Sequence, residues 1–414
     1  MLQKYIVKGN FFMLKHLFAA ALIACFCFAP QMLSAEDIVI RKRSQDNPTI
    51  TFTGAAGDTE MNNAINRFLS VCGWFDAPRQ GNSAEYTLRS ERVNGFLHIY
   101  LFRADQRIAG WRFTVSGNAR QTAKQVVDTV IEHVFEQLRV RGFCQSRIAF
   151  CAETAPGIRN IFLCDIDGGN IEQVTNYNTL NVEPCWSPTG QTICFSKYGR
   201  TGIDVIETTV ATPRRSRIIS SFRGINTGAA ISPDGNYLAV ILSPDHQVDL
   251  YILGLNQRTR RRLTSGIAVE ASPCWSPDGK KLAFVSDRRG NPRIFIVNAD
   301  GSNLQMLPTV GIDAVTPAWS SDGKIAYATR RSRGSAYSIA VYNLNTGSNE
   351  FVSRGEGGWE SPGWAADNRQ VVCKRILNGK SSLWIVDTLT GRERELLRTG
   401  TELFDPAWSP CIRR

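Results

Sequence analysis

The chain has 414 residues, 43% of them hydrophobic, and a formal net charge of +11. This length suits two or three domains, and the hydrophobic content excludes a wholly disordered chain. A positive surplus can serve nucleic acid, an anionic membrane or an acidic partner, but no run of like charge reaches the length of a binding tail. The densest stretch, Arg258 to Arg262, is interrupted by Thr259. We therefore interpret the charge as a diffuse surface property and expect no nucleic-acid partner.

Residues 1–35 are typical of a secretory signal peptide. Lys8 and Lys15 supply positive charge, Leu17 to Phe28 is an apolar run, and Leu33-Ser34-Ala35 ends in a small residue that suits cleavage. The run is too short for a comfortable membrane span, and no later segment is longer and equally apolar. The pattern predicts an exported chain that has no membrane span once the signal is removed.

Two alternatives concern this leader. Met13-Leu14-Lys15 opens a more conventional signal, so Met13 is a second candidate start. Leu22-Ile23-Ala24-Cys25 has the form of a bacterial lipoprotein cleavage box, which would leave a lipid on Cys25. The apolar run continues through Phe26 to Ala29, past that cleavage point, and this favours removal of the whole leader.

Residues 36–143 predict a small α/β domain with two helices on one face of a sheet. Apolar residues recur at helical spacing after Gly57-Asp58 and again from Ala123 to Leu138, and both stripes are interpreted as core. An Asn94-Gly95 turn joins the first two of the three strands expected between the helices. These strands are Tyr86–Val93, Phe96–Phe102 and Ile108–Val115.

Residues 144–414 carry an internal repeat of the form Trp-Ser-Pro-Asp-Gly. Its serine column falls at 187, 232, 276, 320, 365 (alanine) and 409, so the steps are 45, 44, 44, 45 and 44 residues. A period of about 40–50 residues is typical of one four-stranded propeller blade. In the best copy, a strand ending at Trp275 is followed by strands at Lys281–Val285 and Arg293–Val297. The repeat predicts an all-β six-bladed propeller.

The two ends of the repeat complement each other. Arg147–Cys151 reads as a second strand with no motif before it, and the last motif, at Ser409, has no second strand after it. We therefore expect Asp405 to Ser409 to form the inner strand of the blade that begins at Arg147. Such closure removes the free sheet edges that invite aggregation.

The chain shows little sign of catalytic or metal chemistry. It has no Gly-x-Ser-x-Gly elbow, no HExxH and no phosphate-binding glycine loop. His98, His133 and His246 are scattered, and Asp165-Ile166-Asp167-Gly168 coincides with a turn of the repeat. The nine cysteines after the leader lack metal-ligand spacing, although a Cys151–Cys164 bridge is conceivable. We expect no enzyme activity, no metal and no cofactor.

Function is therefore sought in the loops that enter the inner strands and meet at the mouth of the channel. Polar residues gather there, which suits recognition of a protein loop or peptide, although an ordinary solvated rim would look the same. The residue four places before the serine column is Glu183, Gly228, Ser272, Thr316, Ser361 and Asp405 in successive copies, with Glu270 and Glu360 nearby.

A leader, a small α/β domain and this propeller together resemble the TolB family, periplasmic components of the Tol–Pal envelope system of Gram-negative bacteria. The passage Arg141-Gly142-Phe143-Cys144-Gln145-Ser146 and the ending Pro406-Ala407-Trp408-Ser409-Pro410 are its most specific parts. The resemblance implies a periplasmic, non-catalytic monomer that binds the peptidoglycan-associated lipoprotein Pal and helps maintain the outer membrane during division. It implies partner-binding roles for Glu183, Asn226, Glu270, Ser272, Thr316, Glu360 and Asp405.

The resemblance also implies that the segment after the leader engages a TolA-like inner-membrane protein. The candidate residues are Glu36, Asp37, Ile38, Val39 and Ile40. The sequence departs from the family's pattern in the basic run Arg41-Lys42-Arg43 and in Ile225, where a polar loop residue is expected. Two other functions stay open, an exported propeller enzyme (a hydrolase or lyase) acting on envelope saccharide or peptide, and an exported binding propeller unrelated to Pal.

Overall fold

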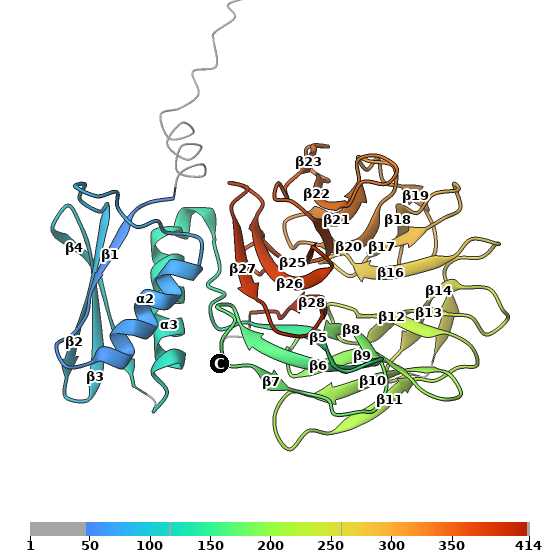
Figure 1. The fold of residues 1–414 in the computed structure, drawn as a ribbon, viewed down its shortest axis with the longest axis horizontal. Helices are drawn as coiled ribbons and strands as arrows, with labels where there is room; N and C mark the ends of the chain where they lie inside the picture. Colours follow the sequence, from blue (N-terminus) through green and yellow to red (C-terminus); the bar gives the residue numbers. More distant parts are fainter. Residues whose placement is uncertain (1–46, 116, 258, 412–414) are drawn as a thin grey trace, which may run out of the picture. The chain divides into compact units, whose positions relative to one another are not determined.

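The computed structural model describes residues 47–411 apart from 116 and 258, so the predicted leader and segment 36–46 lie outside the described residues. One four-stranded sheet with two helices comes first, and six four-stranded sheets follow (Figure 1). The fold class is therefore as predicted, a small α/β region with a six-bladed β-propeller. Within the described ranges, no helix combines the length and apolar character needed to cross a membrane.

The α/β region packs both of its helices on the same side of its sheet (Figure 1). The strand order is β1-β2-β3-β4, with β1 parallel to β2 and the other pairs antiparallel. Ile65 of the first helix and Val127 of the second share one core with Ile99 of the sheet. The parallel edge strand β1 is not predicted by the sequence pattern. The elements are β1 (Ile50–Thr53), α2 (Thr59–Val71), β2 (Tyr86–Val93), β3 (Phe96–Arg103), β4 (Gln106–Thr114) and α3 (Ala119–Val134).

The end of the second helix differs from the prediction. The apolar stripe extends to Leu138, whereas α3 ends at Val134 and a 3₁₀ turn, η1 (Glu136–Leu138), follows. Arg139 then takes a left-handed φ of 52°, which ends the turn. Leu138 is 40% exposed. Its prediction as a core residue is wrong, because the tighter 3₁₀ geometry changes the face on which its side chain lies.

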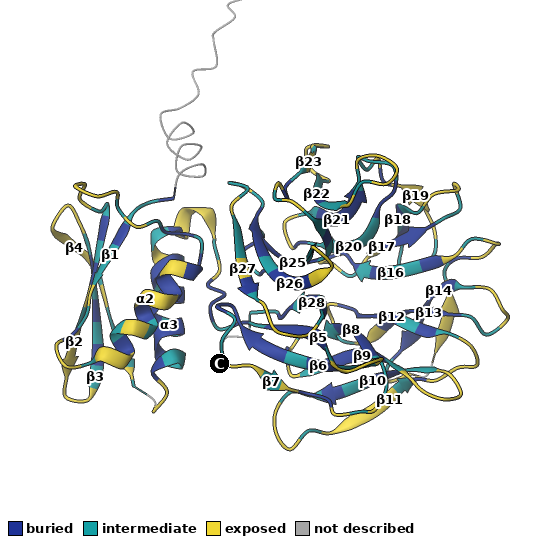
Figure 2. Ribbon diagram, in the orientation of Figure 1, coloured by how far each residue is buried: buried dark blue, intermediate teal, exposed yellow. Residues whose placement is uncertain are grey.

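Each propeller blade is an antiparallel sheet whose strands follow one another in the chain, except that blade 6 adds the last strand to the first three. Buried residues concentrate in the second strand of each blade, and the loops and outer strands are more exposed (Figure 2). Blade 1 is β8 (Asn181–Trp186), β9 (Thr192–Tyr198), β10 (Ile203–Thr209) and β11 (Ser216–Ser220); blade 2 is β12 (Asn226–Ile231), β13 (Tyr237–Leu242), β14 (Asp249–Gly254) and β15 (Arg260–Arg262); blade 3 is β16 (Glu270–Trp275), β17 (Lys281–Ser286), β18 (Arg293–Asn298) and β19 (Gln305–Met306). Blade 4 is β20 (Val315–Trp319), β21 (Lys324–Arg330), β22 (Tyr337–Asn343) and β23 (Asn349–Phe351); blade 5 is β24 (Gly358–Trp364), β25 (Gln370–Leu377), β26 (Lys380–Asp387) and β27 (Glu393–Leu397); blade 6 is β28 (Leu403–Trp408), β5 (Arg147–Ala155), β6 (Ile158–Asp165) and β7 (Glu172–Gln173).

The predicted closure of the ring is confirmed. β28 pairs antiparallel with β5, so that Leu403 lies opposite Ala152 and Trp408 opposite Ile148. The hydroxyl of Ser409 accepts a hydrogen bond from the backbone N–H of Arg147 at 2.9 Å. Two segments that are more than 250 residues apart in the chain therefore share one sheet.

The repeated motif closes its turn with its own side chains. In blade 3, Ser276 Oγ donates to Asp278 Oδ1 (2.6 Å) and accepts from the backbone N–H of Lys281 (2.8 Å). Gly279 takes the left-handed conformation, with a φ of 69°. In blade 5, Asn368 takes that position with a φ of 56°, a conformation that asparagine tolerates. The turn therefore survives in a copy that lacks the glycine.

Tryptophans of the motif join neighbouring blades. The indole N–H of Trp275 donates to the carbonyl of Ala230 in blade 2 at 2.9 Å. The acceptor lies two residues before the serine column, where every copy has a small side chain that leaves the backbone accessible to the indole. The same bond joins Trp186 to Ala407 and Trp364 to Ala318, each at 3.0 Å.

This bond predicts a difference between two conservative substitutions. Trp275→Phe removes the indole donor, whereas Trp319 makes no indole hydrogen bond to any described residue and serves as the control. We expect Trp275→Phe to lower the free energy of unfolding by about 1 kcal/mol more than Trp319→Phe, the usual net value of one hydrogen bond. Chemical denaturation of both variants measures this, and equal losses would contradict the inter-blade role.

The α/β region contacts the propeller at the turns that follow the inner strand of blade 5 and the third strand of blade 6, which lie at the same end of the blades. Trp74 donates its indole N–H to Asp367 Oδ2 at 3.0 Å, and Arg369 donates to Asn47 Oδ1 at 2.9 Å. Lys124 of α3 forms a buried ion pair with Asp165 of blade 6 at 2.6 Å. Because inner strands run from the entering loops to these turns, the channel mouth lies at the other end of the blades.

All nine cysteines of the described region are free thiols. Cys151 lies opposite Ile161, and Cys164 lies opposite Ile148. The two thiols also pack into different cores, one between blades 6 and 1 and the other toward the α/β region. The conceivable Cys151–Cys164 bridge is therefore wrong, because the side chains project from opposite faces of their sheet.

Candidate partner-binding site at the channel mouth

The six inner strands share one irregularity. Each carries an extra residue relative to its neighbouring strand, as between Val182 and Cys185 in blade 1. The residue at this bulge has a φ between 46° and 61° in every blade, and only one of the six is a glycine. Left-handed conformations cost energy in other residues, so strain is concentrated in one ring of positions. These positions, here called the bulge ring, are Glu183, Gly228, Ser272, Thr316, Ser361 and Asp405.

Glu183 of the bulge ring connects two blades. Its Oε2 atom accepts hydrogen bonds from Ser196 Oγ (3.0 Å), Thr227 Oγ1 (2.6 Å) and the backbone N–H of Gly228 (3.0 Å). The last two donors belong to blade 2. The side chain of one bulge residue is therefore fixed by the backbone of the next, which a carboxylate with its several acceptor sites can do.

Asp405 continues this connection across blades 5, 6 and 1. Its Oδ2 accepts from the backbone N–H of Glu183 and its Oδ1 from Ser361 Oγ, both at 3.4 Å. Burial raises the pKa of Asp405, and the nearby Glu183 carboxylate raises it further. Burial and the same two carboxylates also raise the pKa of Tyr198. The mouth thus holds two carboxylates close together where blades 6 and 1 meet.

Two cations border these carboxylates. The aromatic ring of Phe404 has the guanidinium of Arg159 3.5 Å from its centroid and the ammonium of Lys374 4.7 Å away. Lys374 also forms an ion pair with Glu360 at 3.1 Å. Glu360 therefore lies at the mouth with its charge already paired, whereas Glu183 and Asp405 are held mainly by hydrogen bonds.

Asn226 and Glu270 occupy a different position, six residues before the serine column, and both are buried. Asn226 accepts from the N–H of Phe222 (2.9 Å) and donates to its carbonyl (2.6 Å), which fixes the loop before the strand. Glu270 pairs with Arg288 at 2.5 Å, and burial raises its pKa against the opposing effects of Ser286 and Arg288. Both residues shape the loops that enter blades 2 and 3.

The remaining predicted residues fall in two groups. Ser272 and Thr316 belong to the bulge ring in blades 3 and 4 and are half-buried, and the Thr316 hydroxyl has no hydrogen-bond partner among the described residues. Glu36, Asp37, Ile38, Val39 and Ile40 lie outside the described residues. The bulge ring is thus acidic in blades 6 and 1, a glycine in blade 2 and hydroxyl-bearing in blades 3 to 5.

Sequence reasoning missed the residues that support the acidic part of the ring. Thr227 and Phe404 stand one position before the bulge, where the other copies have Val182, Ala271, Val315 and Glu360. Three of the six residues in this column are small or aliphatic, so the departures at Thr227, Glu360 and Phe404 are the signal that points to them. Ser196 and Arg159 lie on other strands and give no comparable signal. Within residues 47–411, no cluster of His, Cys, Asp and Glu suits a metal ion.

The raised pKa of Asp405 predicts a pH dependence of stability. The folded-state pKa of Asp405 exceeds its ordinary value of 3.8. At pH values between the two, Asp405 keeps its proton in the folded protein, whereas the unfolded chain has released it. Stability from this group is present below pH 3.8 and is lost as the pH rises through the folded pKa. We expect Asp405→Asn to be less destabilised than the wild type over that rise.

Asp234 provides a control of opposite sign. Hydrogen bonds from Ser232 and the N–H of Asn236 lower its pKa, so its contribution is present above the ordinary value and is lost on acidification. For each variant we compare its free energy of unfolding with that of the wild type. As the pH changes across the acid range, this difference should move in opposite directions for Asp405→Asn and Asp234→Asn. The same direction in both variants would contradict the assignment.

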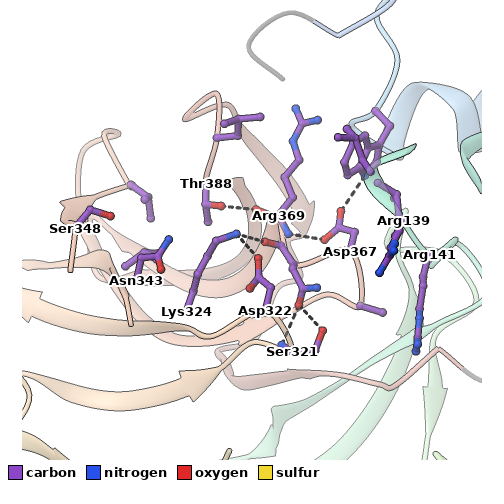
Figure 3. A pocket seen from close by; sticks show the side chains of 18 of the residues that line it. Arg139, Arg141, Ser321, Asp322, Lys324, Asn343, Ser348, Asp367, Arg369 and Thr388 are labelled. Atoms are coloured by element: carbon purple, nitrogen blue, oxygen red, sulfur yellow. Dashed lines mark hydrogen bonds and ion pairs between the residues drawn. The ribbon is translucent and has the colours of Figure 1, made fainter. Parts of the chain in front are cut away.

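A separate cleft of about 750 Å³ lies where the α/β region meets blades 4 and 5. Arg139 and Arg141 lie on the side away from Asn343 and Ser348 (Figure 3). Between them, Lys324 pairs with Asp322 at 2.6 Å and donates to the carbonyl of Asn368 at 3.1 Å. Most charged groups in the middle of this cleft are therefore engaged with its own walls.

The fold and the mouth together define a β-propeller with an appended α/β domain, whose candidate site is a binding surface of loop and bulge residues. The family model described as the TolB β-propeller domain matches residues 135–412. The chain belongs to this family.

Curated relatives carry the name Tol-Pal system protein TolB. That of Anaeromyxobacter dehalogenans is 29% identical over 49% of this chain and 46% of its own length. That of Desulfosudis oleivorans is 32% identical over 34% of this chain and 32% of its own. The alignments thus span less than half of these relatives. The crystal structure of TolB from Acinetobacter baumannii has a TM-score of 0.78 over 88% of this chain and 97% of that one, and at 21% identity it shows the fold alone.

Proposed function

We propose that the chain is a non-catalytic periplasmic scaffold of the Tol–Pal system. In this proposal the channel mouth binds a Pal-like peptidoglycan-associated lipoprotein, which supports outer-membrane integrity and constriction during cell division. The observation that carries the proposal is the TolB-family propeller, together with relatives named for the Tol-Pal system. A cleaved signal peptide over residues 1–35 would deliver the chain to the periplasm as a monomer.

The geometry of the mouth supports a binding role. Bulges turn side chains out of the regular alternation of a strand, and here six of them lie in one ring on a closed scaffold. Inter-blade hydrogen bonds hold Glu183 and Asp405 in place before any partner arrives. A preorganised polar surface loses little conformational entropy on binding, which favours recognition of a folded partner.

The test uses residues 36–414 and the soluble domain of a Pal-like lipoprotein, with the dissociation constant measured by calorimetry. Glu183→Gln/Asp405→Asn should weaken binding about tenfold or more, because charged hydrogen bonds contribute about 1.5–3 kcal/mol each. The matched control, Asp234→Asn/Asp278→Asn, removes two carboxylates at the turn end of the blades and should bind like the wild type.

Two results would overturn the proposal. One is the absence of measurable binding by the wild-type protein. The other is binding that the mouth substitutions leave unchanged. Hydrolysis of envelope saccharide or peptide that disappears in the mouth variant would instead support the alternative of an exported propeller enzyme.

We extend the proposal to the segment after the leader. Glu36 to Arg43 would engage a TolA-like inner-membrane protein, as the family relationship suggests. Deleting this segment should abolish binding of a soluble TolA-like domain in the same calorimetric assay. Retention of that binding would remove the segment from the proposal and leave the role of the mouth in place.

A further inference from the structure

The sheet of the α/β region has one face that the helices do not cover (Figure 1). Along β3, Leu97, Ile99 and Leu101 are fully buried against α2 and α3. The alternate residues are half-buried and lie on the uncovered face. They are Phe96, His98, Tyr100 and Phe102, so this face carries an aromatic row along its central strand.

Three arginines lie over this row. Arg112 of β4 is 4.7 Å from the ring centroid of Phe96, and Arg107 of β4 is 4.2 Å from that of Tyr100. From the other side, Arg89 of β2 is 4.5 Å from the centroid of Phe102. All three side chains belong to exposed residues, and none forms an ion pair with a described acid.

Gly110 makes room for this arrangement. It lies directly opposite Tyr100 on the neighbouring strand. A Cβ atom at this position would stand 2.2 Å from Arg107 Nη2 and 3.1 Å from Tyr100 Cδ1. The absence of a side chain therefore leaves room for the guanidinium of Arg107 over the ring of Tyr100.

The physical consequence is a set of immobilised, unneutralised cations. A guanidinium that lies over a ring has lost much of its side-chain freedom. Its N–H groups, which lie in the plane of the guanidinium, still point outward. Such groups accept a carboxylate in bidentate fashion at little further entropic cost. Within β2, β3 and β4, Glu91 is the one acid on this face, and it lies opposite His98.

We propose that this face binds an acidic segment of a partner protein, laid along β3. The strip from Phe96 to Phe102 is about 20 Å long, the length of one extended segment of six or seven residues. The face carries three guanidiniums and one carboxylate, whereas a membrane-binding cluster has about four to eight cations. This favours a protein segment over a membrane as the partner. The face is separate from the channel mouth, so the inference stands independently of the proposed function.

The test measures binding of a fluorescent ten-residue peptide of alternating Glu and Ser to residues 36–414. Arg89→Gln/Arg107→Gln/Arg112→Gln should weaken binding at least tenfold. The matched control, Arg215→Gln/Arg260→Gln/Arg261→Gln, should leave binding unchanged. It removes three exposed arginines of the propeller, two in the outer strand β15 and one just before the outer strand β11. Gly110→Ala keeps every charge but displaces Arg107, and it should weaken binding several-fold.

Each other outcome overturns the inference. Absence of binding, equal loss in the propeller control, or an unchanged affinity in Gly110→Ala would each do so. Tighter association with phosphatidylglycerol vesicles than with the peptide would identify the face as a membrane surface instead. Binding of the Pal-like domain should be unaffected by the three sheet substitutions, which separates this test from that of the channel mouth.

Discussion

Ending the chain at Thr401 should prevent the propeller from folding cooperatively. The truncation removes β28, whose Leu403 and Trp408 are buried in the core between the blades and the α/β region. Losing a buried leucine and a buried tryptophan costs about 2–5 and 3–5 kcal/mol respectively. Together these approach the whole stability of an ordinary domain, about 5–15 kcal/mol. The edge of β5 is also left unpaired.

A chain ending at Cys411 is the matched control, because it keeps every described residue. It should unfold at the same denaturant concentration as the full chain in circular dichroism. A synthetic peptide of residues 402–411 should restore a cooperative transition to the shorter chain by adding back the missing strand. A cooperative, unshifted transition in the chain ending at Thr401 would show that the closing strand is dispensable.

The ring and its closure could be predicted because each depends on a pattern that recurs along the sequence. Steps of 44 or 45 residues fix the period of the blades, and the incomplete copies at Arg147 and Ser409 show which segments must pair. Tight turns add to this, since Ser276, Asp278 and Gly279 specify their conformation within five residues. Local chemistry and a long-range period therefore agree, which is the condition for a reliable prediction of fold.

The site could be predicted only in part, because the bulge interrupts the alternation on which such reasoning depends. Counting back from the serine column gives Glu183 and Asp405 correctly as a column, yet it cannot show that this column forms a bulge. Nor can it show that Asn226 and Glu270, the first residues of their inner strands, are buried. One inserted residue exchanges the faces of everything before it. The hydrogen bonds of Glu183 also depend on Thr227 in the next blade, which no local pattern specifies.

The contacts between the two parts of the chain were likewise beyond sequence reasoning. Arg369 stands at the motif turn of blade 5, where other copies have Lys280 or Asn236 as solvent-exposed residues. Here the guanidinium is buried by Trp74, with its carbon 4.6 Å from the ring centroid, and by Asn47. The position four residues after the serine column is therefore exposed in blades 2 and 3 but buried in blade 5. The reason is that the turn of blade 5 contacts Trp74 and Asn47 of the α/β region.

Arg369→Met should therefore destabilise the protein strongly. The side chains of Arg369 and Asp387 are 7% and 8% exposed, and the guanidinium binds the carboxylate through Nε at 3.0 Å and through Nη2. Breaking a buried pair by removing one partner typically costs about 3–5 kcal/mol, because the remaining charge stays buried without its counterion. Denaturant titration should show this loss in the free energy of unfolding.

The comparison with two further variants identifies the cause. Arg398→Met breaks the exposed pair with Glu395 and should cost at most about 1 kcal/mol, since water screens that interaction. Arg369→Met/Asp387→Leu removes both buried charges and should recover much of the loss, because no unpaired carboxylate remains. A double variant as unstable as Arg369→Met would mean that the pair of charges is not the cause. Packing on Trp74, or the bonds that Asp387 Oδ1 accepts from the N–H groups of Leu389 and Thr390, would then carry the stability.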